Sequence, residues 1–185
     1  MKKFKAVIFD MDGLLMDSEW MGGEAIHVCA APQGYTIPEE LCKKCIGINT
    51  KASGAMLREY FPGLDTERLF NDFAVYMHEK AVKGEIPVKK GVWELVRYLK
   101  EHRIPTAVAS SSRMETIQLY LDSVGLTPYF DVLLSGSGMP SKPAPDVFLL
   151  AAEKLFVQPE DCLVLEDSYN GVKAGRAAGM QVCMV

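Results

Sequence analysis

The chain has 185 residues, of which 49% are hydrophobic and 24% charged, so it can bury a core as one sizeable domain or as a domain with a large insertion. Its formal net charge of −4 at pH 7 argues against nucleic acid or an anionic membrane surface as the main partner. No apolar run approaches the roughly 20 residues of a membrane span, and the apolar run near the start is too short for a signal peptide, so we expect a cytosolic location. We also expect a monomer.

The first predicted strand spans residues 6–9, an apolar run that is followed by two acids, Asp10 and Asp12. Side chains two residues apart at the end of a strand point the same way. Like charges at this separation repel each other, and their removal from water is costly. The pair therefore calls for a positively charged group nearby.

Residues 17–88 differ from the rest of the chain because they contain few apolar runs of strand length. Helical patterns are separated by Pro38, Gly47 and Pro62-Gly63. The predicted helices span residues 39–45, 51–60 and 66–83. We interpret this segment as a mostly helical insertion after the first strand.

The five cysteines are scattered, and their number is odd. Cys42 and Cys45 form a lone C-x-x-C pair, without two further ligands at the spacing of a zinc site. We therefore interpret the cysteines as reduced packing residues.

From residue 91 onward, helices alternate with continuous apolar strands. The predicted strands span residues 106–109, 131–134, 162–165 and 181–185, and the predicted helices span 91–102, 113–124, 146–155 and a segment that ends at Gly179. Asp146 is expected to cap its helix, and Ser168 or Asn170 the last one. This alternation predicts an α/β fold, a doubly wound parallel sheet, with a core of residues 1–16 and 89–185 and a helical domain of residues 17–88.

Polar side chains follow the predicted strands at the points where the strands end. They are Asp10 and Asp12 after the first strand, Ser110 after the second, and Glu166 and Asp167 after the fourth, with Lys142 between the third strand and the next helix. Because ligands of open parallel sheets bind outside the carboxyl ends of the strands, we expect one shared pocket.

The residue types in this set suit phosphoryl chemistry. Carboxylate oxygens of Asp10 and Asp167 can hold a hard cation such as Mg²⁺, which offsets their repulsion. A lysine and a serine hydroxyl suit phosphate oxygens. A carboxylate beside a phosphoryl group can act as a nucleophile, and Asp12 is placed to carry a proton.

Four separated motifs, in this order, resemble the haloacid dehalogenase (HAD) superfamily, in its branch of small-molecule phosphatases and β-phosphoglucomutases. The motifs are Asp10-Met11-Asp12-Gly13, Ser110 with the serines after it, Ser141-Lys142-Pro143-Ala144-Pro145-Asp146, and Glu166-Asp167-Ser168 with Asn170-Gly171. The resemblance implies a HAD-like Rossmannoid core, with residues 17–88 as a helical cap that closes over the site and selects the substrate.

The resemblance also implies a role for each matching residue. Asp10 would be the nucleophile that forms an aspartyl-phosphate, and Asp12 the acid and base. Ser110, Ser111 and Lys142 would bind the phosphoryl oxygens. Mg²⁺ would be held by Asp10, the backbone carbonyl of Asp12, Asp167 and Glu166, the last as a further or indirect ligand. Ser111 and Ser112 stay open between phosphate binding and helix capping.

The chain departs from the mutases of this branch at two places. The nearest histidine to the expected position near Gly22 is His27, and Ile48-Asn49-Thr50-Lys51 occupies the region of the sugar-phosphate arginine. Lys51 lacks the bidentate fork of arginine, although Arg113 is another candidate for a distal phosphate. We therefore predict a Mg²⁺-dependent phosphatase of a small phosphorylated metabolite, such as a sugar phosphate or a nucleoside-type monophosphate, with a phosphosugar mutase as the alternative.

A non-enzymatic phospho-acceptor module, similar to a receiver domain, is the third hypothesis. It uses similar residue types, but it carries no large helical insertion after its first strand, and Asp131 begins a strand here. Separately, no helix follows the last strand, which ends at Val185, so we expect the sequence to be an incomplete chain.

Overall fold

The computed structural model describes residues 4–45 and 50–185. Gly47, Ile48 and Asn49, in the region of the sugar-phosphate arginine, lie outside these ranges. The chain divides into two compact units, which are Met1–Asp17 with Pro87–Val185 and Ser18–Ile86. All residues predicted for the site belong to the first unit.

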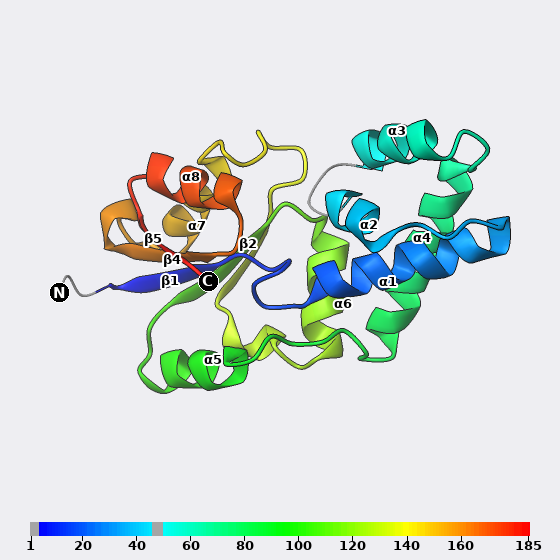
Figure 1. The fold of residues 1–185 in the computed structure, drawn as a ribbon. Helices are drawn as coiled ribbons and strands as arrows, with labels where there is room; N and C mark the ends of the chain where they lie inside the picture. The colour runs from blue at the N-terminus through cyan, green and yellow to red at the C-terminus, as the bar shows by residue number, and fades with distance from the viewer. Residues whose placement is uncertain (1–3, 46–49) are drawn as a thin grey trace. The chain divides into compact units, whose positions relative to one another are not determined.

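The first unit is built on a parallel sheet, which has five strands within the described residues (Figure 1). The strands are β1 (Ala6–Phe9), β2 (Thr106–Ser110), β3 (Val132–Ser135), β4 (Cys162–Glu166) and β5 (Gln181–Met184). Their order across the sheet is β3-β2-β1-β4-β5, which places β1 in the centre. All of β1 is buried, as its uninterrupted apolar sequence predicts. The predicted doubly wound α/β fold is confirmed.

Helices cover both faces of this sheet. They are α5 (Val92–Glu101), α6 (Met114–Ser123), α7 (Asp146–Lys154) and α8 (Tyr169–Ala177), with short 3₁₀ turns η2 (Thr127–Tyr129) and η3 (Pro159–Asp161). The chain passes from β1 through β2 to β3 at one edge of the sheet and then crosses back to β4, on the other side of β1. Because the crossovers are right-handed, the helices that precede β3 and the helices that follow it lie on opposite faces of the sheet. α7 and α8 pack against Ala6 and Ile8, while α5 lies on the other side (Figure 1).

The starts of α7 and α8 test the two capping predictions. The N-cap position of α7 is Pro145, without a side-chain cap, so the prediction that Asp146 caps this helix is wrong. A capping residue needs a non-helical backbone, and Asp146 is already inside the first turn. Ser168 does cap α8, because its Oγ accepts a hydrogen bond from the backbone N–H of Gly171 at 3.0 Å.

The second unit is helical within the residues that the structure describes. Its elements are α1 (Ser18–Ala30), η1 (Ala31–Gln33), α2 (Glu39–Cys45), α3 (Thr50–Tyr60) and α4 (Thr66–Val82). The sequence predicted α2, α3 and α4 to within one residue at each end. A separate apolar core holds these helices together, with Ile37, Leu57 and Leu69 fully buried.

The sequence did not predict α1 as a separate helix. Its buried positions do recur at helical spacing, but the residues that occupy them are mostly small, as in Gly22, Ala25 and Ala30. Gly22 and Gly23 also lower the helix propensity of the segment. Contact with α4 compensates for this, since the space at Gly22 is filled by the ring of Phe73.

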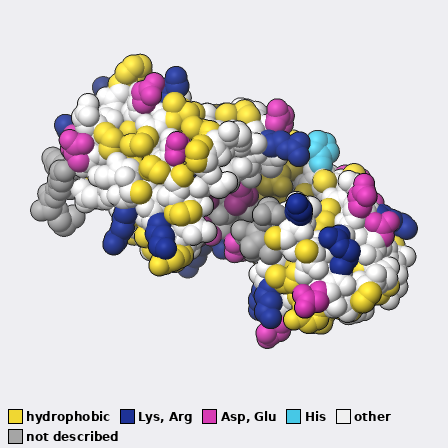
Figure 2. Space-filling model, turned by 90° about the horizontal axis from the view of Figure 1, so that it is seen from above, with side chains coloured by type: hydrophobic (Ala, Val, Ile, Leu, Met, Phe, Trp, Pro, Cys, Tyr) yellow, Lys and Arg dark blue, Asp and Glu magenta, His cyan; other side chains and the backbone are white. Residues whose placement is uncertain are grey.

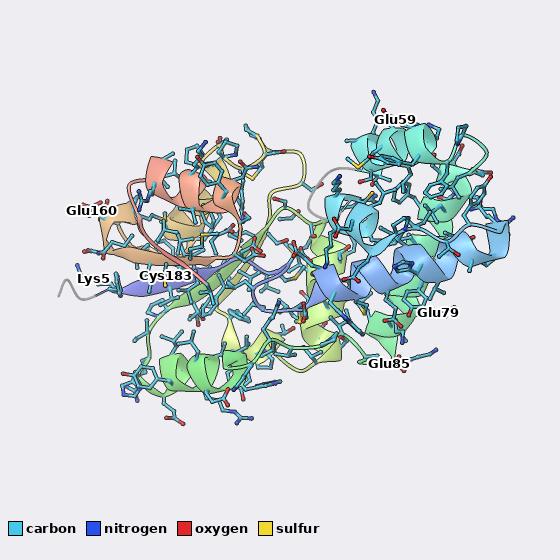
Figure 3. All side chains as sticks on the ribbon, viewed as in Figure 1. Lys5, Glu59, Glu79, Glu85, Glu160 and Cys183 are labelled. Carbon is cyan, nitrogen blue, oxygen red and sulfur yellow. The ribbon has the colours of Figure 1, made fainter. Side chains whose placement is uncertain are left out.

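Charged side chains of both signs are interspersed on the face drawn in Figure 2, in keeping with the small net charge. At the start of β1, Lys5 Nζ lies 2.7 Å from Asp161 Oδ2, and Figure 3 labels Lys5 and the neighbouring Glu160 at this end of the sheet. Among the described helices, none is both long and apolar enough to cross a bilayer.

Candidate active site

The candidate site lies at the carboxyl ends of β1 and β4, where the strand order reverses. β1 leads toward β2 on one side, and β4 leads toward β5 on the other. Asp10 directly follows β1, and its backbone N–H donates to the carbonyl oxygen of Leu165 at 3.0 Å. Glu166 is the last residue of β4. Such a reversal is where open α/β sheets bind their ligands.

The ammonium group of Lys142 joins these two strand ends. Its Nζ lies 2.5 Å from Asp10 Oδ1 and 2.6 Å from Glu166 Oε1, and it donates to the carbonyl oxygen of Ala109 at 3.2 Å. The Lys142 side chain is only 8% exposed and lies over the ring of Phe148. The lysine, which lies in the loop between β3 and α7, thus contacts the carboxyl ends of the three neighbouring strands β2, β1 and β4.

The site carries more negative than positive charge in a buried setting. Burial raises the pKa of Asp10 to about 7, against the attraction of Lys142 and with the repulsion of Glu166. Burial alone would lower the pKa of Lys142, but the attraction of Asp10 and Glu166 raises it above its usual range. Two buried carboxylates therefore share one ammonium, and a further cation would relieve their repulsion.

Asp12 is held by the serine run after β2. Its Oδ2 accepts hydrogen bonds from Ser110 Oγ at 3.2 Å and from Ser112 Oγ at 2.9 Å. Ser110 is fully buried, and its Oγ also accepts from the backbone N–H of Ser112. Ser111, which the resemblance assigned to phosphate binding, is exposed between them. The contact of Ser112 with Asp12 is neither of the two roles that the sequence left open for this serine, which were phosphate binding and helix capping.

Both carboxylate oxygens of Glu166 have partners. Oε1 accepts from Lys142, and Oε2 accepts from the backbone N–H and the hydroxyl of Ser168, each at 2.9 Å. The residue is 1% exposed. These contacts favour a role for Glu166 in holding Lys142. Asp167 follows β4 directly and is partly exposed at the same end of the sheet.

The carboxylate oxygens at this end of the sheet suit Mg²⁺ by their chemistry. Within residues 4–45 and 50–185, no group of three or more His, Cys, Asp or Glu side chains is arranged to hold a metal ion. Mg²⁺ does not require such a cage, because it keeps several waters and binds through one or two carboxylates together with substrate phosphate. Asp10 and Asp167 on adjacent strand ends, with the negative charge of the site, match this mode of binding.

The family model for haloacid dehalogenase-like hydrolases matches residues 7–185. The chain belongs to this family. Phosphorylated carbohydrates phosphatase of Thermotoga maritima is 35% identical to this HAD-family chain over 181 residues, which are 96% of this chain and 82% of that protein. Hexitol phosphatase B of Escherichia coli K12 is 32% identical over 191 residues, covering 100% of this chain and 84% of that protein.

A solved structure supports the same relationship. The HAD family hydrolase of Deinococcus radiodurans R1, crystallised with bound phosphate and sodium, is 29% identical, with a TM-score of 0.83. The match covers 98% of this HAD-family chain and 80% of that one.

Proposed function

We propose that this chain is a Mg²⁺-dependent phosphatase that hydrolyses a small phosphorylated metabolite, either a sugar phosphate or a nucleoside-type monophosphate. The observation that carries the proposal is the position of Lys142, whose ammonium lies between Asp10 and Glu166 at the strand reversal. The phosphatase names of the relatives from Thermotoga maritima and Escherichia coli support it.

Asp10 is the proposed nucleophile. Its carboxylate oxygen attacks phosphorus, the ester bond to the leaving oxygen breaks, and an aspartyl-phosphate forms. Asp12 gives its proton to the leaving oxygen. Water then attacks phosphorus, Asp12 takes a proton from that water, and inorganic phosphate leaves with Asp10 restored. Because Lys142 already contacts Asp10, it is placed to hold the incoming phosphoryl oxygens together with Ser110.

Asp10, Asp167 and the backbone carbonyl of Asp12 would hold the Mg²⁺ ion. Bound there, it supplies positive charge opposite the carboxylates and the phosphoryl oxygens. The sequence also proposed Glu166 as a ligand, but the bonds of Glu166 to Lys142 and Ser168 support an indirect role.

The contact of Asp131 argues against the phospho-acceptor alternative. Asp131 precedes β3, and its Oδ2 accepts from the backbone N–H of Thr106 at 2.8 Å, at the amino ends of the strands. An acceptor aspartate belongs at the opposite ends, where Asp10 lies. The mutase alternative is separated from the phosphatase by the fate of the phosphoryl group.

The test is a panel of sugar phosphates and nucleoside monophosphates, assayed for inorganic phosphate with Mg²⁺ and with a chelator. We expect Mg²⁺-dependent release of phosphate from at least one ester, and loss of turnover in Asp10→Asn. Asp122→Asn, on the exposed side of α6, is the matched control and should retain activity. Transfer of phosphate within a sugar, without release, would favour the mutase. Turnover that survives the chelator or Asp10→Asn contradicts the mechanism.

The expectations of a cytosolic location and a monomer belong to the same proposal. Size-exclusion chromatography with light scattering tests the second of these. A mass near 20.5 kDa is expected, and twice that mass would contradict it.

A further inference from the structure

The carboxylate of Glu166 rests against the first turn of α8. Ser168 donates to one of its oxygens through both its backbone N–H and its hydroxyl, and the same hydroxyl accepts from the backbone N–H of Gly171. The other oxygen of Glu166 faces Lys142. The hydrogen bonds from Ser168 at the start of α8 therefore fix one oxygen of the carboxylate, and the other oxygen is left to bind the lysine.

Gly171 lies directly beside this carboxylate. A Cβ atom at position 171 would overlap the carboxylate carbon and both oxygens of Glu166, which are its three nearest atoms. Gly171 lies within α8, and its φ is not among the positive values of the chain, so its backbone suits other residues too. Space, and not backbone conformation, is what a larger residue would lack here.

We infer that Gly171 is a positioning residue of the active site: its missing side chain leaves the space in which Glu166 holds Lys142 against Asp10. The inference rests on the proposed function for its catalytic consequence, but not for its geometry. An alanine at 171 would push the far end of the Glu166 side chain aside. The hydrogen bonds to Ser168 and Lys142 would then be lost together.

Gly175, one turn further along α8, provides a matched contrast. A Cβ at Gly175 would meet Val182 Cγ2 at 2.7 Å and Val164 Cγ2 at 3.4 Å, which are apolar atoms of β5 and β4. All three of the atoms nearest to such a Cβ belong to these valines, so Gly175 serves the packing of the helix on the sheet. Gly175→Ala is therefore the control variant: it crowds the contact between α8 and the sheet, and we expect it to leave Glu166 in place.

The first test does not depend on activity. Lys142→Met is introduced into the wild type, Gly171→Ala and Gly175→Ala, and the urea midpoint of each protein is measured. If Gly171→Ala already separates Glu166 from Lys142, the midpoint shift caused by Lys142→Met should be smaller in that background than in the wild type. The shift in the Gly175→Ala background should equal that of the wild type. Equal shifts in all three backgrounds would overturn the inference.

The second test measures turnover of p-nitrophenyl phosphate with Mg²⁺. We expect Gly171→Ala to lower kcat/KM by about 100-fold, as expected for a misplaced catalytic group, and Gly175→Ala to leave it within about twofold. Glu166→Asp and Gly171→Ala should not multiply in the double variant, since both act through one carboxylate. Multiplied losses, or equal losses in both glycine variants, overturn the inference.

The two tests fail separately. A wild-type protein that hydrolyses no ester, yet shows the smaller Lys142→Met shift with Gly171→Ala, refutes the proposed function and supports the positioning role. A wild-type phosphatase with equal shifts and an unaffected Gly171→Ala variant refutes the positioning role alone.

Discussion

Lys142 shows how one side chain can organise charges from distant parts of the sequence. The carboxyl ends of parallel strands meet at one edge, so the sequence could indicate that Asp10, Glu166 and Lys142 approach each other. It could not indicate that Glu166 has both oxygens engaged, because this depends on the first turn of α8. The roles predicted for the site residues remain proposals.

The role of Ser112 could not be predicted for a related reason. Three serines follow one another, and the turn after β2 decides which hydroxyl faces Asp12. Only Ser110 belongs to the strand, and strand periodicity therefore gives no direction for Ser111 or Ser112.

Ser112→Ala should lower kcat for phosphate-ester hydrolysis by about tenfold, because a hydrogen bond to a charged group contributes about 1.5–3 kcal/mol. Without the Ser112 hydroxyl, Asp12 loses the 2.9 Å bond, which is the shorter of the two that it accepts from this serine run. Steady-state kinetics provide the measurement. Ser123→Ala, whose hydroxyl bonds to Tyr120 on α6, is the control and should match the wild type. An unchanged kcat in Ser112→Ala would show that Asp12 is positioned without it.

At the scale of elements, the pattern of residues predicted the helices whose apolar stripe is large and whose ends are marked. α4 follows Pro62-Gly63 and begins after Asp65, and its bounds agree with the sequence to within one residue. α1 was missed because the residues of its buried stripe are mostly small, and small residues carry little hydrophobic signal. Tertiary contact with α4, which no local pattern contains, stabilises it.

The start of α4 offers a test of capping. Asp65 Oδ1 accepts a hydrogen bond from the backbone N–H of Arg68 at 3.0 Å. The side-chain amide of Gln33 accepts from the backbone N–H of Asp65 and donates to its carbonyl oxygen. Asp65→Ala should lower the free energy of unfolding by about 1 kcal/mol, since the backbone N–H loses its partner. Urea denaturation measures the change. Asp65→Asn keeps a capping oxygen and should lose much less, and equal losses in both variants would contradict a capping role.

For the whole molecule, the sequence predicted a doubly wound parallel sheet and its family, and both are confirmed. The order of the strands was not predicted, because each strand of a buried sheet is apolar along its length and carries no mark of its neighbour. The role of residues 17–88 as a substrate-selecting cap stays a prediction.

The cysteines report on the folding of both units. Cys29, Cys42, Cys45 and Cys162 are buried, whereas Cys183 is exposed on the edge strand β5 (Figure 3), which corrects the interpretation of all five as packing residues. Burial raises the pKa of Cys42 and of Cys162 to about 11.

In the native protein, a disulfide reagent such as Ellman's should therefore label one thiol rapidly and the other four slowly, because thiolates react and buried thiols are neutral. Absorbance at neutral pH provides the count, and denaturant should make all five react. Cys183→Ser is the matched variant and should lose the rapid phase. A rapid phase that persists in it would mean that a second thiol is accessible.

The central position of β1 has a consequence for refolding. β1 ends at Phe9 and pairs with β2, which begins at Thr106, and with β4, which begins at Cys162. The contact between Asp10 and Lys142 therefore depends on pairings between segments that are distant in the sequence. Such long-range closures are slow steps. During refolding, enzymatic turnover should consequently recover later than the circular dichroism signal of the helices. The recovery of turnover would report the pairing of the central strands.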